Sequence, residues 1–181
     1  VICKQLDGDK NDLPKFTSYM CGANRPGHFS GVFRIVKLLF EIIDPNYAYF
    51  GKKDFQQLLL VKYIASTYFP KLKIIDVDTV RDSNNIALSS RLSKVSCESI
   101  HQVKLIFQTL MTMKKKLLSG LEYNAVKESS LLDLEDNNIS VEYLDLRRLD
   151  TLKEQVNINH PCGIFIACYI DNIRLIDNIE I

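Results

Sequence analysis

The chain has 181 residues, of which 46% are hydrophobic and 25% are charged, and its net charge is +1. This composition is ordinary for a soluble globular protein with one domain or two small ones. The balanced charge gives no general attraction to nucleic acid or an anionic membrane, and no apolar run approaches the ~20 residues of a transmembrane helix. We therefore expect neither a nucleic-acid partner nor a membrane partner.

Five cysteines are present, Cys3, Cys21, Cys97, Cys162 and Cys168. Their number is odd and no pair has Cys-x-x-Cys spacing, so we expect neither a disulfide framework nor a zinc site, and a reducing cytoplasm fits best. Cys162 and Cys168 lie in or beside an apolar run and are expected to be buried structural thiols.

The first half of the chain has the pattern of alternating helices and strands. Residues 1–20 are polar and give no clear element. The predicted elements that follow are a helix at 29–43, a strand at 47–50, a helix from Asp54, which can cap it, to about 68, and a strand at 72–77. This order predicts a parallel sheet with crossover helices.

The pattern changes after Val80, where we place a domain boundary. A polar loop is followed by a long predicted helix from about 96 to 119, with lysines in its last turns and Gly120 past its end. A short helix and loop are expected at 125–138, and strands at 139–146, 163–170 and 174–181. The sequence thus predicts α/β structure up to residue 79 and a small α+β unit from residue 80.

The stretch Gly51-Lys52-Lys53-Asp54 joins the first strand to its helix. Ligands of parallel sheets bind at the carboxyl ends of strands, where a helix N-terminus attracts anions and a lysine can neutralise phosphate. Gln56 and Gln57, in the first helical turn, can bind a hydroxyl or carboxylate. A plain cap with two solvated lysines is the alternative for this turn.

Two further stretches carry candidate site residues. Ala87 to Leu92, "ALSSRL", places two hydroxyls beside one arginine, which suits a phosphate clamp or a plain loop. Arg25 and His28 stand just before a helix, where a histidine is more often structural than catalytic. The chain has neither the P-loop pattern nor the dinucleotide-binding glycine pattern.

Taken together, these motifs resemble the pantothenate synthetase (pantoate–β-alanine ligase) family. The family pattern R-P-G-H-F-x-G-V matches residues 25–32, and D-P-x-x-A-x-F-G-E-K-D-x-Q-Q matches 44–57. V-R-x-x-x-G-L-A-x-S-S-R-N matches residues 80–92, V-x-Y-L-x-L-R matches 141–147, and R-L-I-D-N matches 174–178. Several motifs in order are far more specific than any one of them.

The resemblance implies a fold and a reaction. The fold is the back half of a Rossmann-like domain, related to class I aminoacyl-tRNA synthetases, at residues 1–79, and an α+β lid domain with an antiparallel sheet at residues 80–181. The reaction is the ATP-dependent condensation of (R)-pantoate with β-alanine through a pantoyl adenylate, with AMP and pyrophosphate released and Mg²⁺ assisting. A cytoplasmic homodimer with small-molecule substrates is expected.

The resemblance also assigns roles to individual residues. Gly51, Lys52, Lys53 and Asp54 would contact ATP, with Lys53 on phosphate and then on the acyl phosphate, and Asp54 on the ribose. Gln57 would hold pantoate and Val80 would pack near adenine. Arg25 and His28 would line or brace the site. The phosphate loop would consist of Leu88, Ser89, Ser90 and Arg91, and Lys53, Ser89, Ser90 and Arg91 are the residues we expect to act in catalysis.

The chain departs from the family pattern in several ways. Lys52 replaces a glutamate, Asn85 replaces a glycine, and Leu92 replaces an asparagine. Asparagine tolerates left-handed backbone geometry better than most residues. The family's H-x-G-H signature, its first pantoate-binding glutamine and its acidic Mg²⁺ cluster are absent, so no metal ligand is expected in this chain. We therefore expect a fragment of the full ligase, inactive by itself.

Two alternatives remain at this point. One is a related adenylate-forming nucleotidyltransferase that uses another acid. The other is a non-catalytic fragment used for binding or for dimer contacts. Gln57 and the R-L-I-D-N ending oppose the first, and the joint presence of Lys53, Asp54 and the Ser-Ser-Arg triplet opposes the second.

Overall fold

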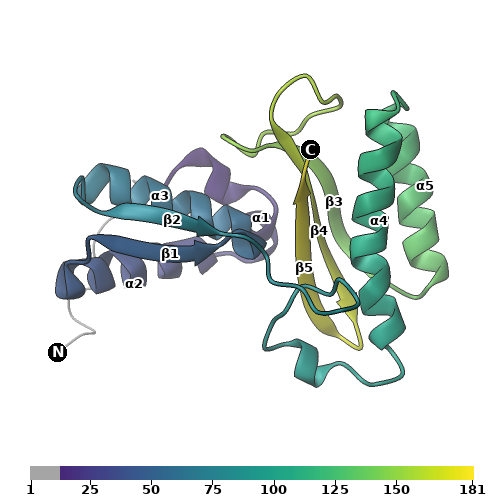
Figure 1. The fold of residues 1–181 in the computed structure, drawn as a ribbon, viewed down its shortest axis with the longest axis horizontal. Helices are drawn as coiled ribbons and strands as arrows, with labels where there is room; N and C mark the ends of the chain where they lie inside the picture. The colour runs from purple at the N-terminus through teal and green to yellow at the C-terminus, as the bar shows by residue number, and fades with distance from the viewer. Residues whose placement is uncertain (1–12) are drawn as a thin grey trace. The chain divides into compact units, whose positions relative to one another are not determined.

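The computed structural model describes residues 13–181, which leaves Cys3 outside the described part of the chain. The chain divides after Asp78 into two compact units. We call residues up to Asp78 unit 1 and Thr79–Ile181 unit 2, and Figure 1 shows the elements of each.

Unit 1 has the predicted strand–helix–strand order. Its elements are the 3₁₀ turn η2 (Lys15–Ser18), α1 (Cys21–Asn24), α2 (His28–Ile43), β1 (Tyr47–Gly51), the 3₁₀ turn η3 (Lys52–Asp54), α3 (Phe55–Tyr68) and β2 (Lys73–Val77). β1 and β2 pair in parallel, with Tyr47 opposite Lys73 and Gly51 opposite Val77. The predicted parallel sheet is therefore confirmed.

An aromatic and aliphatic layer holds the elements of unit 1 together. Phe40 of α2 contacts the rings of Phe50 and Phe69 edge-on, with centroids 6.3 and 5.6 Å apart. Leu60 and Ile64 of α3 are fully buried. Asp44 takes the left-handed conformation directly before Pro45, and α2 ends there, as predicted.

Unit 2 is an antiparallel sheet with two helices on one face (Figure 1). Its elements are the 3₁₀ turn η4 (Leu92–Lys94), α4 (Ile100–Leu118), α5 (Tyr123–Asp136), β3 (Ser140–Arg148), β4 (Cys162–Ile170) and β5 (Ile173–Glu180). The strand order is β3-β4-β5. Asp171 and Asn172, both left-handed, form the tight turn between β4 and β5.

The core of unit 2 lies between the helices and the sheet. Leu110 and Met113 of α4 pack with Leu146, Ile164 and Ile166 of the strands, and all five have no exposed surface. Cys162 and Cys168 belong to the same cluster. Both are buried free thiols, as expected, and burial raises the pKa of Cys168 to about 12, which keeps this thiol protonated and unreactive.

Two helix predictions needed correction. α4 begins at Ile100, four residues later than expected, because Asp171 binds the turn before it: its carboxylate accepts from the Ser96 amide at 2.9 Å and from the Ser99 hydroxyl at 2.8 Å. α5 is a 14-residue helix where a short helix and loop were expected. The carboxylate of Glu122 starts it by accepting from the Ala125 amide at 2.8 Å.

α1 was not predicted, and the other helices and strands were predicted to within about three residues of their observed bounds. Among residues 13–181, none of the helices combines the length and the apolar character that crossing a bilayer requires. In the same residues, His, Cys, Asp and Glu side chains do not gather in groups of three that could hold a metal ion.

Candidate functional site

The turn after β1 leaves open space above its backbone. β1 ends at Gly51, η3 follows, and α3 begins at Phe55. Gly51 has a φ of −74°, which any residue can adopt, and a Cβ placed on it would meet no atom within 4 Å. The local backbone does not require glycine here, and the absence of a side chain leaves the backbone of the turn uncovered at this residue.

Lys52 of this turn forms an ion pair with the residue that follows β2. Lys52 Nζ lies 2.9 Å from a carboxylate oxygen of Asp78, the residue after β2. Both groups therefore sit at the carboxyl ends of the two parallel strands. Asp78 is highly exposed, so this pair contributes at most about 1 kcal/mol to stability. Lys53 is half-buried in the same turn.

Asp54 does not cap α3 in the predicted way. It occupies the N-cap position, but its side chain makes no capping hydrogen bond, because the preceding residues form the 3₁₀ turn and give Asp54 a φ of −95° and a ψ of 57°. The carboxylate is exposed at the entrance of the helix. The prediction of a capping aspartate was therefore wrong, and its carboxylate is directed to solvent.

The two glutamines of α3 differ completely in their surroundings. Gln56 is buried; its amide donates to the carbonyls of Phe16 and Tyr19, both at 2.8 Å, and accepts from the Cys21 amide at 3.2 Å. It joins the segment before α2 to α3. Gln57 is half-buried and takes no part in this network. Gln56 therefore has a buried structural role that the sequence did not predict.

Arg25 and His28 contact each other at the start of α2. Arg25 Nη1 lies 3.1 Å from His28 Nε2. Arginine can only donate, so Nε2 is the acceptor and the neutral ring carries its proton on Nδ1. The His28 ring also lies 4.9 Å from the Phe29 ring. These contacts are those of a bracing pair.

In unit 2, residues 80–91 form a compact hairpin that ends in the predicted phosphate loop; we call it the 80–91 segment. Asn85 has a φ of +63°, so it adopts the left-handed geometry that we expected it to tolerate in place of glycine. Ile86 and Ala87 are buried, whereas Val80 and Leu88 are 62% and 50% exposed. Ser90 and Arg91 are exposed, and Ser89 is half-buried.

The predicted site residues therefore fall into two groups. Arg25, His28 and the turn from Gly51 to Gln57 belong to unit 1, while Val80 and Leu88 to Arg91 belong to unit 2. In unit 1, the residues from Gly51 to Gln57 share one turn and the start of α3, whereas Arg25 and His28 lie at the start of α2; in unit 2, Val80 and Leu88 to Arg91 share one hairpin. The Gly51 turn follows β1 and the 80–91 segment follows β2 in the chain, and α/β proteins bind ligands at such connections.

Comparison with known proteins decides the family. A sequence model described as Pantoate-beta-alanine ligase matches residues 9–180. The chain belongs to this family. It is 34% identical over 168 residues to the pantothenate synthetase of Shewanella woodyi and 33% identical over 171 residues to that of Leptospira interrogans. Each match covers 93% of this chain and 60% of the relative, so the chain spans about 60% of their length.

Solved structures of pantoate–β-alanine ligases have the same fold. The pantothenate synthetase of Thermus thermophilus matches 91% of this chain with a TM-score of 0.85 at 31% identity, and 60% of that chain is covered. A Francisella tularensis pantoate–β-alanine ligase, complexed with beta-gamma ATP and beta-alanine, matches 93% of this chain with a TM-score of 0.73 at 29% identity, over 56% of its own length.

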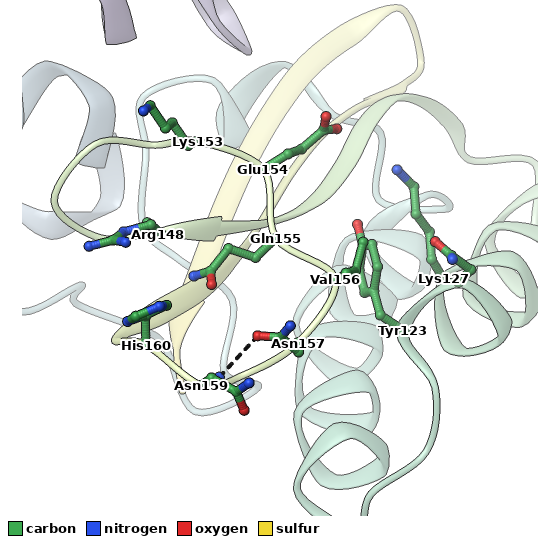
Figure 2. A pocket seen from close by; sticks show the side chains of 11 residues that line it. Tyr123, Lys127, Arg148, Lys153, Glu154, Gln155, Val156, Asn157, Asn159 and His160 are labelled. Carbon is green, nitrogen blue, oxygen red and sulfur yellow. Dashed lines mark hydrogen bonds between the residues drawn. The ribbon is translucent and has the colours of Figure 1, made fainter.

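A cavity that sequence reasoning missed lies in unit 2 of this ligase-family chain. It measures about 560 Å³, and Figure 2 shows residues of the β3–β4 loop on one side and Tyr123 and Lys127 of α5 on the other. Its lining residues are Tyr123, Asn124, Lys127, Arg148, Lys153, Glu154, Gln155, Val156, Asn157, Asn159 and His160. None of them is a predicted site residue.

Acidic neighbours compensate two of the cations around this cavity. Lys127 lies 3.1 Å from Asp145. Arg148 donates to both oxygens of Asp150, at 2.9 and 2.7 Å, and this contact lowers the pKa of Asp150 to about 2. The available sequence signal was a polar loop with Lys153, Glu154, Gln155, Asn157 and Asn159, but such loops are common on protein surfaces. The cavity is a polar surface feature without a concentrated reactive group.

Proposed function

We propose that the complete protein containing this chain is a pantoate–β-alanine ligase. It would use ATP to convert (R)-pantoate to pantoyl adenylate with release of pyrophosphate. The β-alanine amine would then attack the acyl carbon of the adenylate, giving pantothenate and releasing AMP. Family membership and the complex of the Francisella relative with beta-gamma ATP and beta-alanine support this reaction.

The observation that carries the proposal is the accessible turn at Gly51. A phosphate group approaching this turn meets no side chain at Gly51, and it finds Lys53 and the N-terminus of α3 beside it. We assign Lys53 to the α-phosphate and the acyl phosphate, because a lysine neutralises developing negative charge as a mobile point charge. We assign the exposed Asp54 carboxylate to the ribose hydroxyls.

The remaining assignments follow from the same geometry. Gln57 is proposed to hold pantoate, because Gln56 has its amide engaged in the fold. We propose that the phosphates are bound by Ser89, Ser90 and Arg91. In this proposal Leu88 lies beside these residues and Val80 packs near adenine. In this proposal unit 1 supplies part of the nucleotide and pantoate site, and unit 2 acts as the lid.

Mg²⁺ has no ligand cluster in the part of the chain that the structure describes. We therefore assign no step of the reaction to residues of this chain acting through a metal. The residues named above would act by positioning and by charge stabilisation, which can supply much of the rate enhancement in a phosphoryl-centred reaction.

The test is a pair of assays on the complete protein. We expect pantoate-dependent exchange between ATP and pyrophosphate, and AMP release only when β-alanine is also present. Exchange with another carboxylic acid but not with pantoate would favour a related adenylate-forming enzyme. No exchange with any acid would favour a binding role. The 181-residue chain alone is expected to show no turnover.

A further inference from the structure

The R-L-I-D-N sequence on β5 has no role in the reaction as assigned so far. It comprises residues 174–178, and Asp177 and Asn178 are buried polar residues. A buried carboxylate is costly unless it is paired and hydrogen-bonded. The contacts of Asp177 therefore show what this sequence does in the fold.

Asp177 is bound by Arg81, which lies 96 positions earlier in the chain. Arg81 Nη1 donates to one carboxylate oxygen at 2.7 Å, and Nη2 donates to the other at 2.8 Å. The side chains are 16% and 5% exposed, so the pair is shielded from solvent. The Arg81 guanidinium also lies 4.0 Å above the ring of Phe107 of α4. Two-point contact with a carboxylate fixes the orientation of the guanidinium plane.

The same guanidinium holds the hairpin of the 80–91 segment. Arg81 Nη1 also donates to the carbonyl of Asn85 at 3.1 Å. Asp82 closes the turn, because its carboxylate accepts from the amides of Asn84 and Ile86 at 2.8 and 2.9 Å. Arg81 thus connects the tip of the hairpin to β5.

The far end of the segment is attached to the same strand. Arg91 Nη1 donates to the backbone carbonyl of Arg174 at 2.9 Å. Arg174 is itself fixed, because it donates to both carboxylate oxygens of Glu142 on β3, at 3.0 and 2.6 Å. The residues Leu88, Ser89 and Ser90 therefore lie between two attachment points on β5, at residues 174 and 177.

We propose that Asp177 is a positioning residue for nucleotide binding. Through Arg81 it holds the 80–91 segment in the one conformation in which residues 88–91 face the phosphates of ATP. This inference rests on the proposed function of those residues. Without the pair, the segment samples other conformations. The apparent dissociation constant for ATP is inversely proportional to the fraction of molecules in the binding-competent conformation, so it rises as that fraction falls.

The experiment uses the complete protein and the conservative variant Asp177→Asn. Losing a charge-assisted contact should speed amide hydrogen exchange at Ile86 and Leu88 by about tenfold or more, and weaken ATP binding, measured by calorimetry, by a similar factor. The KM for ATP should rise with it, while kcat at saturating ATP stays within about threefold. Arg81→Lys, which keeps one charged donor, should give a smaller shift of the same kind.

The matched control is Asp150→Asn, which breaks another two-point arginine–carboxylate contact of unit 2. It should leave exchange at Ile86 and Leu88 and the KM for ATP unchanged. A variant that is merely unstable loses active fraction and kcat without a change in KM. The positioning role is overturned if wild type binds ATP and Asp177→Asn leaves both exchange and affinity unaltered. Failure of wild type to bind ATP would instead overturn the proposed function.

Discussion

The two units bury their apolar residues in different ways. In unit 2, two helices cover an antiparallel sheet, and the largest apolar side chains of both layers are fully buried. In unit 1, Tyr49 and Val77 lie on the outer face of the parallel sheet, and their exposed fractions are 68% and 39%. Parallel sheets are normally covered on both faces. The sheet of unit 1 is therefore only half-covered by its own helices.

Helix α2 of unit 1 also has an apolar face that no other described part of the unit covers. Phe29, Phe33 and Phe40 form its inner face. A second apolar stripe, with exposures of 48, 47, 67 and 64%, consists of Ile35, Leu39, Ile42 and Ile43. A helix that is apolar on two sides is built to be covered on both. Unit 2 has a closed apolar core, whereas unit 1 leaves apolar side chains of its sheet and of α2 exposed.

The largest expected effect comes from separating the units. Residues 79–181 expressed alone should unfold cooperatively and give a dispersed NMR spectrum, because their core is closed. Residues 13–78 alone should bind a hydrophobic dye and unfold without a sharp transition. Both fragments would be compared by calorimetry and dye fluorescence at equal concentration. A cooperative transition in the shorter fragment would remove the distinction between the units.

Single truncations test the same contrast. Leu110→Ala in unit 2 should lower the free energy of unfolding by about 2–5 kcal/mol, because the removed atoms are fully buried. The control is Ile42→Ala on the outer face of α2, which should cost less than about 0.5 kcal/mol in the 181-residue chain. Denaturant titration measures both. Equal losses would show that the outer stripe of α2 is already covered in solution.

The lysines of the η3 turn provide the next test, in the complete protein. Lys53→Ala should slow adenylate formation by about 100-fold or more, because it removes charge stabilisation at the reacting phosphate. Lys52→Ala removes the ion pair with the exposed Asp78 and should change the rate by less than about threefold. Exchange of labelled pyrophosphate into ATP measures both rates. Equal losses would mean that the two roles are assigned wrongly.

The two glutamines of α3 should separate stability from binding. Gln56→Leu leaves the carbonyls of Phe16 and Tyr19 without their donor, at a cost of about 1–3 kcal/mol in unfolding free energy. Gln57→Leu should leave stability unchanged and raise the KM for pantoate. Thermal unfolding and steady-state kinetics on both variants distinguish the effects. A stability loss in Gln57→Leu with unaltered pantoate kinetics would exclude it from the site.

Some of these features could be predicted from the sequence alone. Apolar periodicity and the breaks at proline and glycine predicted the order of the helices and strands except the four-residue α1, because both are local signals. Asn85 was correctly expected to tolerate left-handed geometry, since this follows from one residue and its turn. The site motifs were found by their order along the chain.

What the sequence did not reveal depends on distant partners. The start of α4 is set by Asp171, far beyond it in the chain, and the difference between Gln56 and Gln57 arises from carbonyls in the segment before α2. Likewise, nothing near Arg81 indicates that Asp177 binds it. Such contacts are created by the tertiary fold, so no local pattern encodes them.

The smallest expected effect concerns a loop of unit 2 and depends on pH. Arg148 holds the pKa of Asp150 at about 2, below its ordinary value of 3.8. Because the folded-state pKa is depressed, the pair stabilises the fold fully above about pH 5, and this contribution is lost as pH falls through about 4 toward about 2. The exposed position of Asp150 keeps the effect small. Thermal unfolding of wild type and Asp150→Asn should differ slightly at about pH 6 and converge near about pH 2. A difference that grows on acidification would mean that Asp150 titrates above its ordinary value.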